Sequence, residues 1–392
     1  MRRLLLLVGL LAVVGCRKLP VDVPTPGTRP APADFAGRLH RQAGPAGNTV
    51  SSPLGVSTAL SMLRLGARGD TDRELAELLG QTGDGVHAET AKRLTDWDTL
   101  GDGTTFKVAN SLWGNAFLPA FAERAGRDYR AAVKPADWTR PDVVAKQVND
   151  WVSGETSGHI PAVVTPADLS DQTIALLVNA TYFDGKWAAP FNKRLTRPAR
   201  FTVADGTVVN VPTMGRNEPE PTGFTAFADG VAVAVPFRDG RFVMVLALPN
   251  KPDGLPAIEE KLTSEQLAAW ASAKQEPIDL QAPTFRFSTR RLLNDDLKQM
   301  GAPLIFEPAA DFSGLAAGQA FVGQVIHEAR IDVGEAGATA AAGTVIEVKK
   351  SDASDRPPPR AVRIDRPFLF AIIDTKTMAV AFLGRVVDPR RK

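Results

Sequence analysis

The sequence predicts one large α+β domain from residue 34 to residue 392, and three observations predict it. The first part of this region places Leu, Met and Ala at helical spacing, over 57–65 and again over 72–79. The later part contains short apolar runs bounded by Pro, Gly and Asp, which are typical of strands: 231–235, 242–248 and 368–373. No regular alternation of strand and helix is found, so the pattern favours α+β over a parallel βαβ sheet.

Local signals refine the helical part. Thr71 is followed three residues later by Glu74, which predicts a capping box at the start of the second helix. No internal repeat and no second clear linker follow residue 34, and a domain of ~360 residues is large but feasible.

The N-terminus predicts an export signal. Arg2 and Arg3 precede an apolar run over 4–14, too short for a bilayer-spanning helix of ~20 residues. Gly15 before Cys16 resembles a lipobox, at which removal of residues 1–15 leaves Cys16 as a lipid-modified bacterial N-terminus. Residues 16–33 are rich in Pro and predict an extended tether. The alternative is an ordinary signal peptide with a chance cysteine.

We therefore expect an exported protein that lipid on Cys16 anchors to the cell envelope, or a secreted one if the lipobox is not used. Two or three acyl chains hold a protein on a membrane far better than one. Arg17 stands where an aspartate often retains lipoproteins in an inner membrane, which favours the outer membrane or the cell surface.

Composition and motifs argue against several classes of function. The net charge is +2 with dispersed Lys and Arg, which gives no footprint for nucleic acid, and the single cysteine allows no intramolecular disulfide. Catalytic signatures such as Gly-x-Ser-x-Gly, a Walker loop and His-Glu-x-x-His are missing from the sequence. Asp96 and Asp98 faintly resemble a calcium loop, but Leu100 stands where an oxygen ligand is needed. We expect no catalysis, no metal and no cofactor.

Residues 335–360 form the most unusual segment of the chain. Read with period two, one parity is small or apolar throughout: Ala338, Ala340, Ala342, Thr344, Ile346 and Val348. The other parity ends in the charges of Glu347 and Lys349, as in a strand with one buried face. The opening run of Gly and Ala has poor strand propensity, and Asp, Ser and Pro follow it as in an exposed loop. The segment therefore suits both a strand and an exposed loop. The simpler interpretations are a flexible linker, or a permanent strand followed by a loop.

An ordered series of motifs accompanies this segment: 48–69, 149–152 with 156–160, 177–187, 310–314, His327 eight residues before Glu335, and 365–370. The run 335–342 resembles the hinge of inhibitory serpins, and the other motifs resemble that family in family order. The resemblance covers essentially all of residues 34–392.

The resemblance implies an α+β fold with three β-sheets, about nine helices and an exposed reactive-centre loop at about 335–366. It implies a monomeric suicide-substrate inhibitor of serine endopeptidases, or of cysteine endopeptidases, with the target protease as its covalent partner. After attack on the loop, residues 338–348 insert as a strand into the main sheet and deacylation stalls. The alternative within the family is a non-inhibitory surface binding or structural protein.

The resemblance also implies functional residues. The hinge comprises Glu335, Gly337, Ala338, Thr339, Ala340, Ala341 and Ala342. The reactive bond is expected at Lys350-Ser351, which favours a trypsin-like target, with Ser351-Asp352 and Arg356 as alternatives.

Ser52, Asn179 and His327 resemble the polar cluster that governs sheet opening, and Trp187 resembles the tryptophan where insertion begins. Satisfied buried polar groups and aromatic core packing are their simpler roles. Gly55 departs from the family, which has a second serine there. Ser57 or a water is expected to compensate, or the cluster is smaller.

Overall fold

A computed structural model describes residues 34–81, 83, 85–101, 103–169, 175–338 and 359–391. Within these residues the chain forms nine α-helices and sixteen strands, which confirms the α+β class. All of them belong to one compact unit, 32–392. None of the described helices is both long enough and apolar enough to span a membrane.

The main sheet is six-stranded, in the order β11-β12-β13-β4-β2-β3. Its strands are β2 (Thr105–Gly114), β3 (Ala132–Pro135), β4 (Ala175–Lys186), β11 (Phe285–Leu292), β12 (Gln324–Val333) and the two-residue β13 (Gly337–Ala338). Strands β4 and β12 pair in parallel over 176–181 and 324–329, and β13 separates them at one end. Segment 177–187 of the motif series therefore lies almost entirely in β4, in the middle of this sheet.

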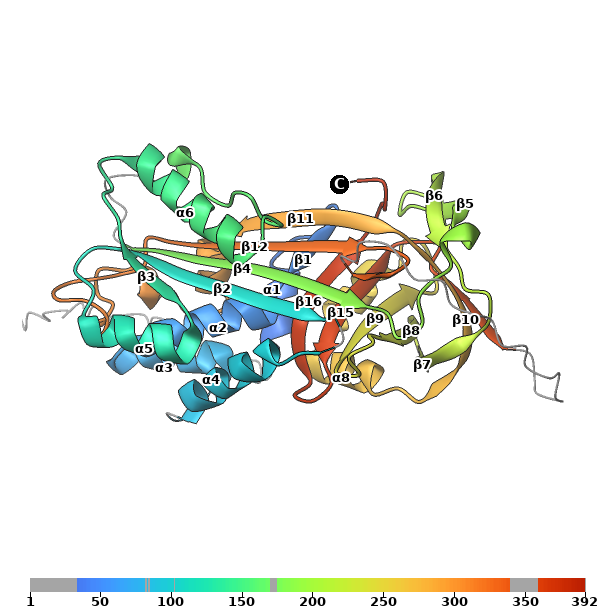
Figure 1. Cartoon of the computed structure of the whole chain (residues 1–392), viewed down its shortest axis with the longest axis horizontal. Coiled ribbons are helices and arrows are strands. Elements are labelled where there is room, and N and C mark those ends of the chain that lie inside the picture. Colours follow the sequence, from blue (N-terminus) through green and yellow to red (C-terminus); the bar gives the residue numbers. More distant parts are fainter. Residues whose placement is uncertain are drawn as a thin grey trace, which may run out of the picture. The chain divides into compact units, whose positions relative to one another are not determined.

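Helices cover both faces of the main sheet, which explains why β4 reads as an almost continuous apolar run. Figure 1 shows α6 (Pro141–Glu155) on one face and α2 (Pro53–Arg64), with its neighbours, on the other. Val144 and Val148 of α6 pack on Leu176 and Val178, whereas the opposite parity, through Leu177, belongs to the cluster built on α2. The remaining helices on the α2 side are α3 (Gly69–Leu79), α4 (Gly85–Asp98) and α5 (Pro119–Tyr129).

A ten-stranded sheet lies against the main sheet. Its strands are β1 (Thr49–Ser51), β5 (Arg197–Thr202), β6 (Val208–Met214), β7 (Glu220–Phe227), β8 (Gly230–Pro236), β9 (Phe242–Pro249), β10 (Gln275–Pro283), β14 (Arg360–Arg363), β15 (Phe368–Asp374) and β16 (Ala379–Val386). The three predicted strand segments are the cores of β8, β9 and β15. Strand β10 pairs with β7 at one end and with β6 at the other, so β5 and β6 continue this sheet. The second and third sheets of the expectation are therefore joined through β10.

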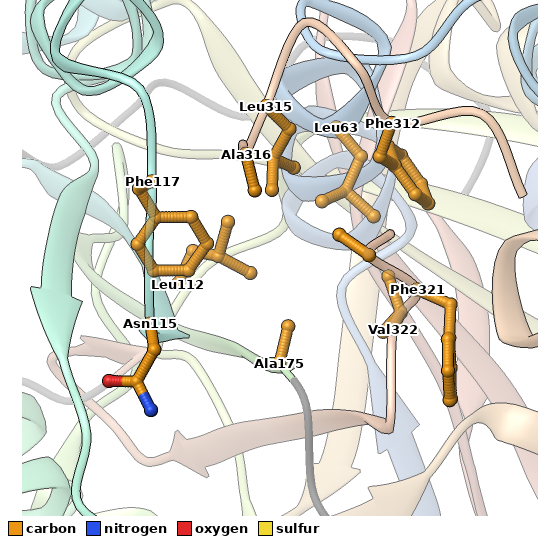
Figure 2. Close-up of a pocket in the computed structure, with 11 residues that line it drawn as sticks. Leu63, Leu112, Asn115, Phe117, Ala175, Phe312, Leu315, Ala316, Phe321 and Val322 are labelled. Carbon is orange, nitrogen blue, oxygen red and sulfur yellow. The ribbon is translucent and has the colours of Figure 1, made fainter. Parts of the chain in front are cut away.

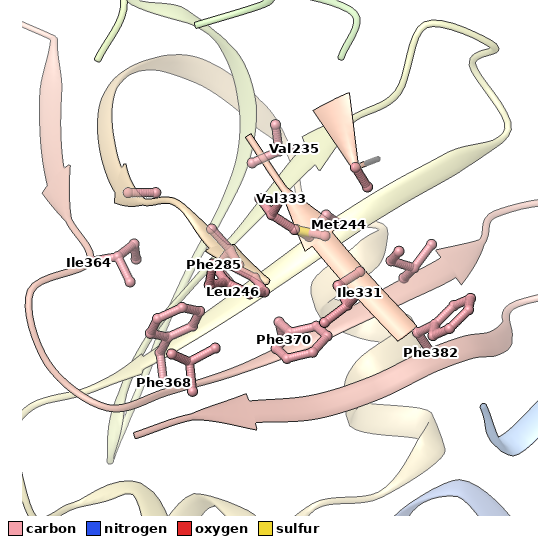
Figure 3. Packing of buried hydrophobic residues seen from close by; sticks show 14 of the residues in the cluster. Val235, Met244, Leu246, Phe285, Ile331, Val333, Ile364, Phe368, Phe370 and Phe382 are labelled. Carbon is pink, nitrogen blue, oxygen red and sulfur yellow. The ribbon is translucent and has the colours of Figure 1, made fainter. Parts of the chain in front are cut away.

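Aromatic and branched side chains from both sheets meet in one core, seen in Figure 3. Ile331 and Val333 of the main sheet face Met244, Leu246 and Phe370 of the larger one. The far face of the larger sheet is covered by α7 (Leu255–Lys261) and α8 (Ser264–Ala271). The remaining helices are the short α1 (Phe35–Arg41) and α9 (Asn294–Gln299).

The structure corrects two predictions about α2 and α3. Helix α2 begins at Pro53, four residues before the predicted segment, because Ser52 caps it through the Gly55 N–H. The predicted capping box at Thr71 is wrong, because α3 already begins at Gly69. The Thr71 hydroxyl instead accepts the Asp311 N–H, and the Glu74 carboxylate accepts the Leu304 N–H.

One apolar cavity of about 10 Å³ lies beneath the start of β4 and is drawn in Figure 2. Leu63 of α2, Leu112 of β2 and Phe312, Leu315 and Ala316 of the segment before β12 line it. A void of this size and polarity stays dry.

Candidate functional site

The expected hinge begins as a strand inserted at one end of the main sheet. Ala338 stands opposite Val333 of β12 and Gly185 of β4, and its side chain is fully buried. Gly337 is required beside it, because a Cβ there would lie 2.0 Å from the Gly185 carbonyl oxygen. The first inward-parity residue is therefore already packed between the two central strands.

Aromatic residues after β4 hold the segment that leads into β13. The Trp187 indole N–H donates to the Gly334 carbonyl at 2.9 Å, and its backbone N–H donates to the Ala336 carbonyl at 3.0 Å. The Trp187 ring stacks on Phe237 with centroids 4.6 Å apart, so the donor is fixed in place. The Phe191 N–H donates to the Glu335 carbonyl, and the Thr196 hydroxyl donates to the Glu335 carboxylate at 2.7 Å.

A buried polar cluster lies under the middle of the main sheet and brings together Ser52, Asn179 and His327. The Ser52 N–H donates to His327 Nε2 at 2.9 Å, so the ring proton sits on Nδ1 and is donated to Asn179 Oδ1 at 2.7 Å. Burial lowers the pKa of His327 to about 3, so the ring is neutral around pH 7. The Ser52 hydroxyl donates to the Ala381 carbonyl of β16 at 2.6 Å. This one serine thus links α2, the main sheet and the larger sheet.

Trp187 is not part of this cluster. It follows Asn179 by eight residues along β4, a separation of roughly 25 Å at ~3.3 Å per residue. The structure therefore divides the four expected residues between two places, the hinge end of the sheet and its middle.

Comparison with known proteins identifies the family of this chain. The family model "Serpin (serine protease inhibitor)" matches residues 31–389. The chain belongs to the serpin family. A putative serpin-Z12 from Oryza sativa is 33% identical over 91% of this chain and 90% of its own, and the leukocyte elastase inhibitor of Bos taurus is 32% identical over 88% and 94%. Serpin48 of the insect Tenebrio molitor has a crystal structure that matches with a TM-score of 0.82 and 26% identity, over 91% of this chain and 97% of its own.

In this serpin the place of the missing serine is filled from β4. A Cβ on Gly55 would lie 2.4 Å from the Thr181 hydroxyl and 2.8 Å from Asn179 Oδ1. The Thr181 hydroxyl donates to Asn179 Oδ1 at 3.2 Å, so it supplies the second hydroxyl of the cluster. The expected compensation by Ser57 is wrong, because its hydroxyl donates to the Leu54 carbonyl within α2.

Asn110 is a further member that the sequence did not reveal. Its side-chain oxygen accepts the Asn179 amide at 2.7 Å, from the neighbouring strand β2. Only strand register brings these two residues together, and no short motif carries that information.

The segment after α6 crosses the outer face of the sheet where β4 and β12 part, and we call residues 156–168 the strap. The His159 ring stacks on Tyr182 of β4 with centroids 4.0 Å apart. Arg330 of β12 donates to the His159 carbonyl at 2.9 Å, and Arg290 of β11 pairs with Asp168 at 2.8 Å. Burial raises the pKa of Tyr182 and of Asp184 beside it. The strap thus bridges the strands between which β13 lies.

Several expected site residues lie outside the described residues: Cys16, Thr339, Ala340, Ala341, Ala342, Lys350, Ser351, Asp352 and Arg356. Within the described ranges, no group of three or more His, Cys, Asp or Glu side chains is arranged to hold a metal ion. Asp96 and Asp98 belong to α4, and Asp96 pairs with Lys92 and Lys376.

Proposed function

We propose that this serpin is a suicide-substrate inhibitor of serine endopeptidases, which traps the acyl-enzyme by inserting residues 338–348 into the main sheet. The observation that carries the proposal is the insertion of Gly337 and Ala338 between β12 and β4. The chain leaves Ala338 antiparallel to both neighbours, so further insertion continues a strand that has already begun.

The register supports insertion without sliding of the existing strands. Where β13 separates β12 from β4, Val333 and Gly185 both pair with Ala338. Where β12 and β4 are direct neighbours, His327 pairs with Asn179. The residue numbers differ by 148 in both places (333 − 185 and 327 − 179). The two strands therefore need only to separate by about one strand spacing, ~4.8 Å, to admit a third.

Continuing the register of β13 assigns a partner to each loop residue. Ala340 would stand between Phe183 and Ile331, and Ala342 between Thr181 and Ala329, on the buried face. Thr344 would stand between Asn179 and His327. Its hydroxyl can both donate and accept, so it can replace the hydrogen bond that these two lose when the strands part.

The outward parity explains why the other early loop residues are also small. Ala341 would stand between Tyr182 and Arg330, under the strap residue His159. Gly343 would follow between Ala180 and Glu328. Because large side chains there would collide with the strap, small residues on both faces favour fast insertion.

The proposed chemistry is that of the target protease. Its serine attacks the carbonyl carbon of Lys350, the bond to the Ser351 nitrogen breaks, and the base of the protease passes the serine proton to the new amine of Ser351. The fragment 351–392 is then covalently free but is held in the larger sheet by β14, β15 and β16. The ester at Lys350 is then carried with the inserting strand, which distorts the oxyanion hole of the protease before water can hydrolyse the ester. A basic residue at this position favours a trypsin-like target, and cleavage at Ser351 or Arg356 are the alternatives.

A panel of trypsin-, chymotrypsin-, elastase- and subtilisin-like proteases tests this proposal. We expect a complex stable in SDS with at least one enzyme, and mass spectrometry of the released C-terminal peptide then identifies the bond. The melting temperature should rise after loop cleavage by a protease that escapes trapping. Cleavage by every enzyme without a complex and without this rise would indicate the non-inhibitory alternative.

We also propose that Cys16 is lipid-modified and anchors this serpin to the envelope of a bacterial cell. The support is the apolar run 4–14 that ends in Gly15-Cys16, followed by the Pro-rich tether. Expression in a bacterium with labelled fatty acid should label the wild type in the membrane fraction. Cys16→Ser should abolish the label, and a labelled Cys16→Ser protein would contradict the assignment.

A further inference from the structure

Strand β5 and the turn before it connect the two ends of the bait loop. At one end the Thr196 hydroxyl binds the carboxylate of Glu335, which precedes the loop, at 2.7 Å. At the other end the Thr202 N–H donates to the carbonyl of Asp365, which follows β14, at 2.8 Å. The six residue steps from Thr196 to Thr202 span roughly 20 Å at ~3.3 Å per residue. A protease of ~230 residues has a radius of roughly 20 Å. A protease bound between these two ends of the loop would therefore be wide enough to contact β5.

This stretch carries an unusual set of exposed cations, which we call the basic edge: Lys193, Arg194, Arg197 and Arg200. Many exposed Arg and Lys side chains elsewhere in the fold form ion pairs, as Lys92 does with Asp96 and Lys146 with Asp150. In the described part of the chain, none of the four basic-edge side chains makes an ion pair. Their charge is therefore presented to solvent.

The surroundings do not neutralise the basic edge. Buried Arg216, which follows β6, adds a charge beneath it and stacks its guanidinium on Phe191 at 4.3 Å. Burial lowers the pKa of Arg216 to about 10, so it remains protonated at pH 7, and its Nε and Nη1 have no partner among the described residues. The nearby carboxylates are Glu335, which is bound to the Thr196 hydroxyl, Glu220, whose charge raises the pKa of Arg216 against the effect of burial, Asp205, which is bound to the Thr207 N–H in the β5–β6 turn, and Glu218. None of these carboxylates forms an ion pair with the four cations among the described residues.

An apolar side chain sits among these cations and indicates the class of partner. Leu195 is 41% exposed, between Arg194 and Arg197, and is one of four large hydrophobic side chains exposed among the described residues. A site for a sulfated polymer needs charge alone, whereas an apolar anchor with a charged rim fits a folded protein surface. Strand β5 is also the last strand in the order of its sheet, and no strand of the described residues pairs with its outer edge.

We propose that the basic edge is a docking surface for an acidic face of the target protease, separate from the scissile bond. The proposal rests on the inhibitory function proposed above, because the partner is the protease bound to the bait loop. Docking of opposite charges accelerates encounter by ~10–1,000-fold and depends steeply on salt. The basic edge would thus select, among proteases of one cleavage specificity, those with an acidic surface.

A charge-reversal pair tests the proposal against a matched control. K193E/R197E changes the net charge by −4 at the basic edge, and K92E/K146E makes the same change on the exposed faces of α4 and α6. Both variants keep charged side chains at their positions, so protection of the β5 edge against aggregation is retained. Anionic and cationic trypsin serve as partners with the same cleavage specificity and opposite surface charge.

Two readouts separate docking from trapping. The first is binding of full-length serpin to anionic trypsin whose active-site serine is replaced by alanine, which cannot form the acyl-enzyme. The second is the second-order rate of inhibition of the active enzyme at about 0.05 M and about 0.5 M salt. At low salt we expect K193E/R197E to weaken binding and slow inhibition of anionic trypsin by about tenfold, with the difference shrinking at high salt. The control should match the wild type, cationic trypsin should react more slowly with the wild type, and the stoichiometry should not change.

Each other outcome has a definite meaning. Equal losses in both variants, no loss in either, or no binding of the wild type to inactive trypsin would overturn the docking surface. Salt-dependent binding that K193E/R197E removes, without a covalent complex from active enzyme, would overturn the inhibitory function and retain the surface. If only added dextran sulfate accelerates the wild type, and K193E/R197E loses that acceleration, the basic edge binds a polyanion and the proposal fails.

Discussion

Ala338→Arg should convert this serpin from an inhibitor into a substrate. The side chain of Ala338 is fully buried in the apolar core that contains Phe183, Trp187 and Val333, none of which can pair with a guanidinium. An unpaired charge in such a place costs several kcal/mol, part of which the long Arg stem avoids by reaching outward. Taking ~3 kcal/mol as the residual cost, insertion slows by about 100-fold.

The stoichiometry of inhibition converts this rate into an observable. It equals one plus the ratio of the hydrolysis rate to the insertion rate. If wild-type insertion is less than ~100-fold faster than hydrolysis, a 100-fold slower insertion raises the stoichiometry from near one to several inhibitor molecules per enzyme. The assay is titration of residual protease activity together with the yield of SDS-stable complex. Because β13 has only two residues, its expulsion should leave the fold intact by circular dichroism.

Two controls isolate the insertion step. Ala338→Ser keeps a small side chain at the same place and should remain an inhibitor. Ala317→Arg adds the same charge at an exposed position before β12 and should match the wild type. An Ala338→Arg protein with a stoichiometry near one and a full yield of complex would refute the reasoning.

Three further predictions follow from the buried parts of the structure. Gly55→Ser should lower the free energy of unfolding by ~1–3 kcal/mol through collision with the Thr181 hydroxyl, and Thr181→Ala should restore much of it, as measured by urea denaturation. The free energy of unfolding of the wild type should fall as the pH drops from ~6.5 toward 3, because His327 binds a proton in the unfolded chain but stays neutral in the folded protein, where its pKa is about 3. His327→Gln should flatten this pH dependence, and an unchanged slope would contradict the prediction. Ala316→Val should raise stability by up to ~1 kcal/mol by filling the apolar cavity, whereas exposed Ala317→Val should not.

The elements with strong local signals were predicted well. Strands β8, β9 and β15 have continuous apolar patterns, and their burial reproduces those patterns. The helical spacing of Leu, Met and Ala located α2, although the structure buries almost the whole helix, including Thr58 and Ser61. The capping box failed because Thr71 and Glu74 cap backbone groups more than 200 residues away. A local motif does not reveal whether its polar side chains serve their own helix or a distant loop.

The polar cluster was predicted only in part. Ser52, Asn179 and His327 were chosen by resemblance, and the structure brings them within hydrogen-bonding distance. Thr181 and Asn110 were missed because their roles depend on the approach of α2 to β4 and on the register of β2 against β4. That the Thr181 hydroxyl occupies the place of a serine at position 55 is evident only from the three-dimensional structure.

The strap and the basic edge were not predicted either. His159 belongs to a recognised motif, but its stacking on Tyr182 links segments that are 23 residues apart. The four cations of the basic edge were read as dispersed charge. Only the hydrogen bonds of Thr196 and Thr202 reveal that they lie between the two ends of the loop.

The two hydrogen bonds of Ser52 bear on how long the uncleaved protein survives in storage. Its N–H is bound to the main sheet through His327 and its hydroxyl to the larger sheet through Ala381, so spontaneous parting of β4 and β12 disturbs contacts in both sheets together. A step that breaks many contacts at once has a large activation enthalpy, and its rate rises ~3–6-fold for every 10 °C. On the inhibitory mechanism proposed above, the working lifetime of this serpin would be set by a rate rather than by an equilibrium, and it should shorten abruptly over a narrow range of temperature.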